Sequence, residues 1–149
     1  MQSDRRRLLG LPLLTLLTAC GGGDHWDEFR PRSATPADLQ NRSFVFTGFR
    51  YGAVFHPSWS GTTATLGFGA ASASVAPATL PFTLDTAAGR SQGTATLAGD
   101  GLTLVVSQPA AAHPFARDEV LSFTVTADVD DGRIRLVNTV TGEEQTSAP

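Results

Sequence analysis

Two His-Pro steps carry the side chains best suited to metal chemistry. His56 lies in "VFHPSW" and His113 lies in "AAHPFA". Imidazole nitrogens bind zinc and copper, and a carboxylate such as Asp118 or Glu119 would complete a mixed site. Alternatively, proline stiffens both loops while their aromatic neighbours cover one end of the fold. Because spacing along the chain does not give the distance between two loops, we expect no resident metal or other cofactor, and metal binding is a remote alternative.

A second pattern has the residue types of nucleophilic catalysis. "GRSQG", from Gly89 to Gly93, matches Gly-x-Ser-x-Gly around Ser91, and Asp100 and His113 follow in hydrolase order. The pattern works where a strand turns sharply into a helix and exposes the serine oxygen. Here the next residues, "TATLAGDG", predict a strand that ends in a tight turn. We therefore favour a hairpin loop, expect no enzyme, and keep an esterase as a remote alternative.

Two acidic stretches have simpler explanations than metal binding. "DVDDG" (128–132) resembles part of a calcium loop, but it lacks the further ligands and the Glu at the twelfth position, so we favour a hairpin turn. "HWDEF" (25–29) combines His25 with two acids and two aromatic rings. Trp26 and Phe29 are side chains that suit a membrane headgroup region. We favour a disordered spacer for this stretch.

The segment "GFRYGAVFHPSWSG" (48–61) is long, aromatic and bounded by glycines. Long loops in compact domains are often functional. Its aromatic side chains either plug the core, line the lip of an apolar pocket, or form a patch for a protein partner together with arginine. The candidate binding residues in this segment and in the second His-Pro step are Arg50, Tyr51, Phe55, His56, Trp59, His113 and Phe115.

The single cysteine, Cys20, lies between an apolar run and three glycines. Arg5, Arg6 and Arg7 precede an apolar stretch from Leu8 to Thr18. Eleven helical residues span about 16 Å, which is short of the roughly 30 Å hydrocarbon core but typical of a cleavable signal. If the segment were a plain secretory signal, Cys20 would remain a free thiol in an oxidising compartment, which would be a liability.

Leu17-Thr18-Ala19-Cys20 resembles the lipobox of bacterial lipoprotein precursors. The resemblance covers about twenty residues and implies a diacylglycerol thioether on Cys20, cleavage before Cys20 and N-acylation of the new amino group. Several acyl chains give the stable anchoring that one chain does not. Gly21 is similar to the residue found in lipoproteins exported to the outer membrane. "DRRRLLG" is similar to a twin-arginine signal, so general and twin-arginine export both stay open.

The composition describes one mildly acidic domain. The chain has 149 residues, 14 acids and 11 basic residues, and every basic residue is arginine. An acidic, lysine-free surface argues against nucleic acid, whose phosphates need basic stripes, and against electrostatic docking on anionic lipid. We divide the chain into a signal peptide (1–19), the lipidated cysteine with a flexible tether (20–38), and a single all-β domain (39–149).

Strand patterns dominate after the tether. "SFVFTGF" (43–49), "TATLGFG" (63–69) and "LPFTL" (80–84) alternate apolar and polar residues, and Pro81 predicts an edge strand or a strand start. Residues 93–107 predict a hairpin with Asp100-Gly101 at its turn, and residues 119–140 predict a second hairpin that turns at 130–132. A last short strand follows Gly142. Residues 35–42 predict one helical turn capped by Thr35.

About seven or eight short strands without long helices predict an all-β fold, either an antiparallel up-and-down barrel or a β-sandwich. The architecture is similar to lipocalin-type small barrels, although their Gly-x-Trp signature is absent here. We expect a lipid-anchored protein of the outer membrane that faces the periplasm. Its domain is a non-enzymatic interaction or scaffolding module for an envelope protein. The alternative is a carrier of a small apolar ligand inside a barrel.

Overall fold

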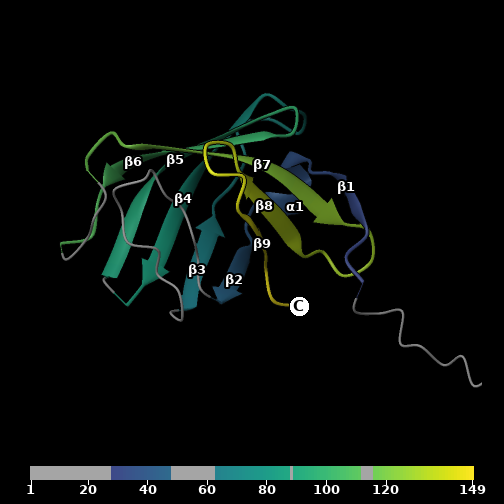
Figure 1. The fold of residues 1–149 in the computed structure, drawn as a ribbon. Coiled ribbons are helices and arrows are strands. Elements are labelled where there is room, and N and C mark those ends of the chain that lie inside the picture. The colour runs from purple at the N-terminus through teal and green to yellow at the C-terminus, as the bar shows by residue number, and fades with distance from the viewer. Residues whose placement is uncertain (1–27, 48–62, 88, 112–115) are drawn as a thin grey trace, which may run out of the picture.

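The computed structural model describes residues 28–47, 63–87, 89–111 and 116–149. The fold is all-β, as predicted: one antiparallel sheet follows the order β2-β3-β4-β5-β6-β7-β8-β9 and curls into a nearly closed barrel (Figure 1). The elements in chain order are β1 (Pro31–Ser33), α1 (Pro36–Leu39), β2 (Ser43–Thr47), β3 (Thr63–Phe68), β4 (Ala78–Thr86), β5 (Gly89–Ala98), β6 (Gly101–Gln108), β7 (Val120–Asp128), β8 (Ile134–Asn138) and β9 (Glu144–Thr146).

The predicted alternation of the strands is confirmed. Phe44 and Phe46 of β2 are buried while Val45 between them is exposed. Burial of alternate side chains is what a half-buried strand requires, because successive residues point to opposite faces. The same pattern puts the following side chains into one core: Ala64, Leu66, Phe68, Leu80, Phe82, Leu84, Ala95, Leu97, Leu102, Leu104, Leu121, Phe123, Val125, Ile134 and Leu136.

Pro81 lies in the interior of β4, not at an edge, so that prediction was wrong. Strand β4 pairs with β3 on one side and with β5 on the other. The Pro81 carbonyl accepts a bond from the Gly69 N–H, and the Gly69 carbonyl accepts one from Asn41. Since the Gly69 carbonyl has this other donor, the missing proline N–H leaves no acceptor unpaired at this point.

Glycines shape the sheet at two places. The β5–β6 loop consists of Gly99 and Asp100, because Ala98 pairs with Gly101, and only Gly99 has a positive φ (61°). The predicted turn at Asp100-Gly101 is therefore one residue too late; glycine stands first, as in a type II′ turn. At Gly93 the register shifts, and a Cβ there would lie 1.9 Å from the Val105 carbonyl oxygen. Such a bulge bends its strand and promotes curvature of the sheet.

The N-terminal segment joins the fold earlier than expected. Residues 31–33 form β1 and pair with residues 126–128 of β7. This part of β7 extends past its ladder with β6, which ends where Gly101 pairs with Thr124. The predicted helical turn follows as α1, and Leu39 is completely buried in the core. We call residues 28–39 the strap. The described part of the expected tether therefore forms β1 and α1. Its polar composition had indicated a flexible segment instead.

Candidate functional site

The strand order defines two ends of the barrel. Consecutive strands are antiparallel. The end of β2 at Thr47 and the start of β3 at Thr63 therefore lie at the same end of the barrel as the end of β6 at Gln108 and the start of β7 at Val120. We call this the loop end. The predicted site residues that lie outside the described part of the chain are Cys20, Arg50, Tyr51, Phe55, His56, Trp59, His113 and Phe115.

The opposite end carries the strap, and we call it the strap end. Strand β1 begins at Pro31 opposite Asp128, the last residue of β7, and the connections 40–42, 69–77, 99–100 and 129–133 lie at this end. In Figure 1 the start of β1 lies on the right, whereas the end of β6 and the start of β7 lie on the left. The chain before Pro31 and the two long connections therefore leave the barrel at opposite ends.

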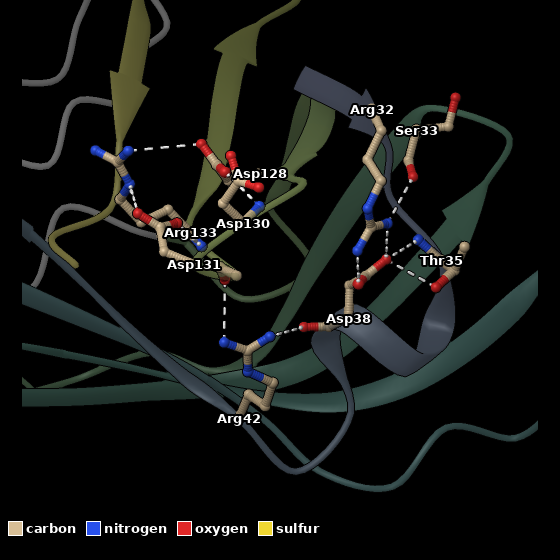
Figure 2. A network of polar contacts seen from close by, with 10 residues as sticks. Arg32, Ser33, Thr35, Asp38, Arg42, Asp128, Asp130, Asp131 and Arg133 are labelled. Carbon is tan, nitrogen blue, oxygen red and sulfur yellow. Dashed lines mark hydrogen bonds and ion pairs between the residues drawn. The ribbon is translucent and has the colours of Figure 1, made fainter. Parts of the chain in front are cut away.

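Asp128 is the centre of the polar network at the strap end (Figure 2). Its side chain is buried, with 1% of its surface exposed. One carboxylate oxygen accepts the Arg30 N–H at 2.9 Å, and the other accepts the Asp130 N–H at 2.8 Å. The Asp130 backbone bond is the largest cause of its lowered pKa, and Arg133 at 3.5 Å contributes to the same direction. Asp128 thus holds both the β7–β8 turn and the strap.

The β7–β8 turn is a hairpin turn, as favoured for "DVDDG". Gly132 has a φ of 72°, the left-handed region that the predicted glycine position requires. Asp130 pairs with Arg30 at 2.9 Å, and Asp131 pairs with Arg133 at 2.6 Å. Each carboxylate of this turn therefore has a guanidinium or backbone partner. Within the described ranges, no group of three or more His, Cys, Asp and Glu side chains is arranged to hold a metal ion.

A second ion pair closes the strap on itself. The two carboxylate oxygens of Asp38 accept bonds from the two terminal nitrogens of Arg32, at 2.7 and 2.5 Å. The Thr35 N–H and hydroxyl also donate to Asp38, which places its charge at the start of α1. These contacts, led by the bond from Arg32, lower the pKa of Asp38 to about 2. A carboxylate in the first turn suits the positive end of a helix.

Phe29 fastens the beginning of the strap to the outside of β8. The Arg135 guanidinium carbon lies 4.1 Å from the centre of the Phe29 ring, and that of Arg133 lies 5.8 Å away. Both distances are in the range of cation–π contacts. Arg135 also pairs with Glu144 at 3.1 Å. The sequence favoured a disordered spacer at 25–29, with a membrane-interface role for Phe29 as the alternative, whereas the Phe29 ring lies against Arg133 and Arg135.

The serine pattern has a structural role in the described residues. Ser91 lies within β5 opposite Leu84, is buried, and accepts a 3.0 Å bond from the Ala110 N–H. No strand-to-helix turn follows it. Asp100 comes after the far end of β5, and seven residues of strand separate Ser91 from Ala98 by roughly 23 Å. The chain therefore does not bring Ser91 and Asp100 into one catalytic group.

The acids proposed beside His113 also have local roles. A Glu119 carboxylate oxygen accepts the Ala116 N–H at 2.8 Å. Asp118 has a φ of 65°, and its N–H donates to the Val106 carbonyl at 2.7 Å. Both residues shape the return of the chain into β7. Beside them at the loop end, Val120 and Val140 expose 56% and 74% of their surfaces.

The described core is filled by side chains. Leu66, Leu80, Leu97, Leu102, Leu104, Val125, Ile134 and Leu136 each have no exposed surface. A side chain that lines a ligand-sized cavity keeps part of its surface free, so these residues do not surround such a cavity. The two described hollows, of about 460 and 300 Å³, instead include exposed residues such as Ser107 and Ala148.

Sequence reasoning missed the strap network because its partners are far apart in the chain. Arg30 and Asp128 are separated by 98 residues. The available signals were the arginines in an acidic chain and the carboxylates of "DVDDG", but neither specified which groups would meet.

Comparisons with protein families, curated proteins and solved structures gave no match to this chain. In the part of the chain that the structure describes, no helix has the length and apolar character needed to cross a bilayer.

Proposed function

We propose that this chain is a lipid-anchored protein of the outer membrane whose barrel faces the periplasm and acts as a non-enzymatic interaction module. The support for the anchor is the leader pattern ending in Leu17-Thr18-Ala19-Cys20. The lipid comprises diacylglycerol on the Cys20 thiol and an N-acyl chain. The partner is an envelope protein.

The observation that carries this proposal is the opposite placement of the strap and the long connections. Phe29 is fixed to β8, and about nine residues separate it from Cys20, with a mean reach of roughly 15–18 Å for a flexible chain. The eight residues of β6 extend about 27 Å along the barrel wall. The anchor therefore keeps the strap end near the bilayer and directs the loop end away from it.

The loop end supplies the interaction surface in this proposal. Segment 48–62 contributes an arginine and several aromatic residues, and segment 109–119 adds His113 and Phe115. Aromatic residues and arginine are enriched at protein interfaces. The exposed Val120 and Val140 extend the apolar surface of this end. The filled core favours this interaction role over transport of an apolar ligand inside the barrel.

Two exposed valines at opposite ends give a matched test of orientation. Val129 at the strap end exposes 52% of its surface, and Val140 at the loop end exposes 74%. Each is changed to cysteine, labelled with a fluorophore in the mature lipidated protein, and placed in vesicles that contain brominated lipid. We expect stronger quenching for Val129→Cys than for Val140→Cys. Equal quenching, or the reverse order, contradicts the proposed orientation.

Partner binding is tested in envelopes solubilised with detergent. A Tyr51→Ala/Trp59→Ala variant should lose a co-purifying protein that the wild type retains, whereas Val75→Ala, an exposed change at the strap end, should retain it. Equal recovery from all three proteins contradicts the interaction surface. Mass spectrometry of the protein from its native host tests the anchor separately, because an unmodified Cys20 thiol contradicts lipidation.

A further inference from the structure

The two outer strands of the sheet, β2 and β9, face each other where the barrel is nearly closed (Figure 1). We call the gap between β2 and residues 144–149 the seam. In the described structure, the backbone bond across it runs from the Ala148 N–H to the Val45 carbonyl at 2.7 Å. Among the described residues, no ladder of paired residues joins β2 to β9, whereas each neighbouring pair in the sheet order shares one.

The register of β2 determines which backbone groups face the seam. The Arg42 carbonyl accepts the Phe68 N–H of β3, while the Val45 carbonyl accepts Ala148 across the seam. Because alternate residues of a strand point their backbone groups to opposite sides, Ser43, Val45 and Thr47 all face the seam. Their side chains are exposed, and Val45 exposes 39% of its surface.

The seam edge of β2 lacks the usual protection against strand addition. Natural edge strands carry charges, proline or bulges, or they are very short. Strand β2 is Ser-Phe-Val-Phe-Thr, with no charge and no proline. Strand β9 has three residues that begin with Glu144, and the chain beyond it reaches Pro149, which has no N–H. Protection is thus present on the β9 side and absent on the β2 side.

A hollow of about 300 Å³ continues this edge toward the strap end. Its lining includes Arg42, Val45 and Ala148, together with Asp131 and Arg133, which pair with each other at 2.6 Å. The Arg42 guanidinium donates to the carbonyls of Asp38 and Gly132 and lies 5.2 Å from the Phe44 ring centre. Among the described carboxylates, none lies within ion-pair distance of Arg42. Because Asp131 in the same lining already pairs with Arg133, the Arg42 guanidinium is the charge in this hollow that an acidic group would complement.

We infer that the free edge of β2 binds an extended acidic segment of a partner protein by strand addition. The partner strand runs antiparallel to β2, as the Ala148 segment does, with a β-branched residue opposite Val45 and a carboxylate three residues later near Arg42. Main-chain bonds supply affinity in this mode, and the side chains supply specificity. Ala148 gives up its bond to Val45, and the incoming strand replaces that bond and adds others. This site lies on the barrel wall and is independent of the loop-end interface.

The probe is a synthetic peptide, acetyl-Thr-Ser-Val-Thr-Ser-Glu-amide, at millimolar concentration with the full mature chain in detergent. Amide hydrogen exchange at Val45 and Thr47 should slow in its presence. A peptide with Lys in place of Glu should bind at least about fivefold more weakly, because it brings a like charge to Arg42. Arg42→Gln should remove this difference between the two peptides.

Three backbone variants separate strand addition from other contacts. Val45→Pro removes a seam-facing N–H and leaves the β2–β3 ladder intact. In this variant the peptide should no longer slow amide hydrogen exchange at Thr47. Val45→Thr keeps that N–H and should retain protection. Ala148→Pro removes the competing bond, and it should strengthen peptide binding by about three- to tenfold even if Val45→Pro fails to fold.

The inference is overturned if the Glu peptide gives no protection at Val45 and Thr47, or if Ala148→Pro leaves its affinity unchanged. Sedimentation of the free protein distinguishes another occupant. A dimer that Val45→Pro dissociates would show that a second copy of the chain covers this edge, and that result would also overturn the peptide site.

Discussion

Replacement of Asp128 tests whether one buried carboxylate fastens the strap to the barrel. Asp128→Ala leaves the Arg30 and Asp130 N–H groups without their acceptor and removes the carboxylate that faces Arg133. Asp128→Asn keeps one carbonyl oxygen in place. The two variants therefore remove different numbers of acceptors from the same site.

The expected magnitude follows from these contacts. A hydrogen bond to a charged group contributes about 1.5–3 kcal/mol, and removal of one partner from a buried charged network costs about 3–5 kcal/mol. We expect Asp128→Ala to lower the free energy of unfolding by about 3–5 kcal/mol and Asp128→Asn by about half as much. For the roughly 100 residues that the structure describes, 3–5 kcal/mol corresponds to a Tm lower by roughly 14–23 °C.

Urea unfolding of the purified protein measures both variants against Asp100→Ala. Asp100 is an exposed aspartate in a turn at the same end, so its replacement should change stability by less than about 0.5 kcal/mol. Amide exchange at Arg30 should increase in Asp128→Ala. An unfolding free energy within 0.5 kcal/mol of the Asp100→Ala value would refute the assignment of Asp128 as the centre of this network.

The pH dependence of the same variants has a defined sign. Because the pKa of Asp128 is lowered in the folded protein, its ionised form stabilises the fold above the ordinary carboxyl pKa of about 4. This stabilisation is lost as the pH falls through the folded-state pKa. The difference in unfolding free energy between the wild type and Asp128→Asn should therefore become smaller below about pH 4. A difference that becomes larger there would contradict the lowered pKa of Asp128 in the folded protein.

Three further predictions concern other parts of the barrel. The carboxyl of Asp38 should titrate near its folded-state pKa of about 2 in an NMR experiment, and Arg32→Gln should raise that pKa, so that stabilisation by Asp38 is present above about pH 4 and lost toward pH 2. Gly93→Ala places a Cβ 1.9 Å from the Val105 carbonyl oxygen, so it should abolish cooperative folding in a thermal melt. Ser91→Ala leaves a buried N–H without its acceptor and should lower the unfolding free energy by about 1–3 kcal/mol in urea, whereas an exposed catalytic serine would tolerate this change.

Local patterns were sufficient to predict the inward faces of the strands. The alternation around Phe44, Phe46 and Leu66 specifies which side of each strand is apolar, and a one-residue slip would expose that side. The turn at Gly132 was equally local, because glycine tolerates the left-handed backbone there. Both features depend on neighbours within a few residues, which a sequence records directly.

Two of the failed predictions depend on partners that are distant in the chain. Pro81 is tolerated in an interior strand because Asn41 supplies the donor that proline lacks. Residues 31–33 were expected to belong to a flexible tether; they carry no sequence signal for a strand, because β1 buries none of its side chains and pairs with residues 126–128. For the candidate site, the sequence indicated which residue types lie in the connections 48–62 and 109–119. Only the strand order showed that the strands beside both connections end at the loop end of the barrel.

The pairing of β1 with β7 sets an order of assembly for a chain made from its N-terminus. Pro31 leaves the ribosome before any other part of the sheet, yet its partner Asp128 follows almost a hundred residues later. Closing so long a loop costs entropy until the contacts within it exist, so the first strand to be synthesised is among the last to dock. During this interval the N-terminal segment is not yet paired with β7, and completion of the β7–β8 hairpin then fixes the strap against the finished barrel.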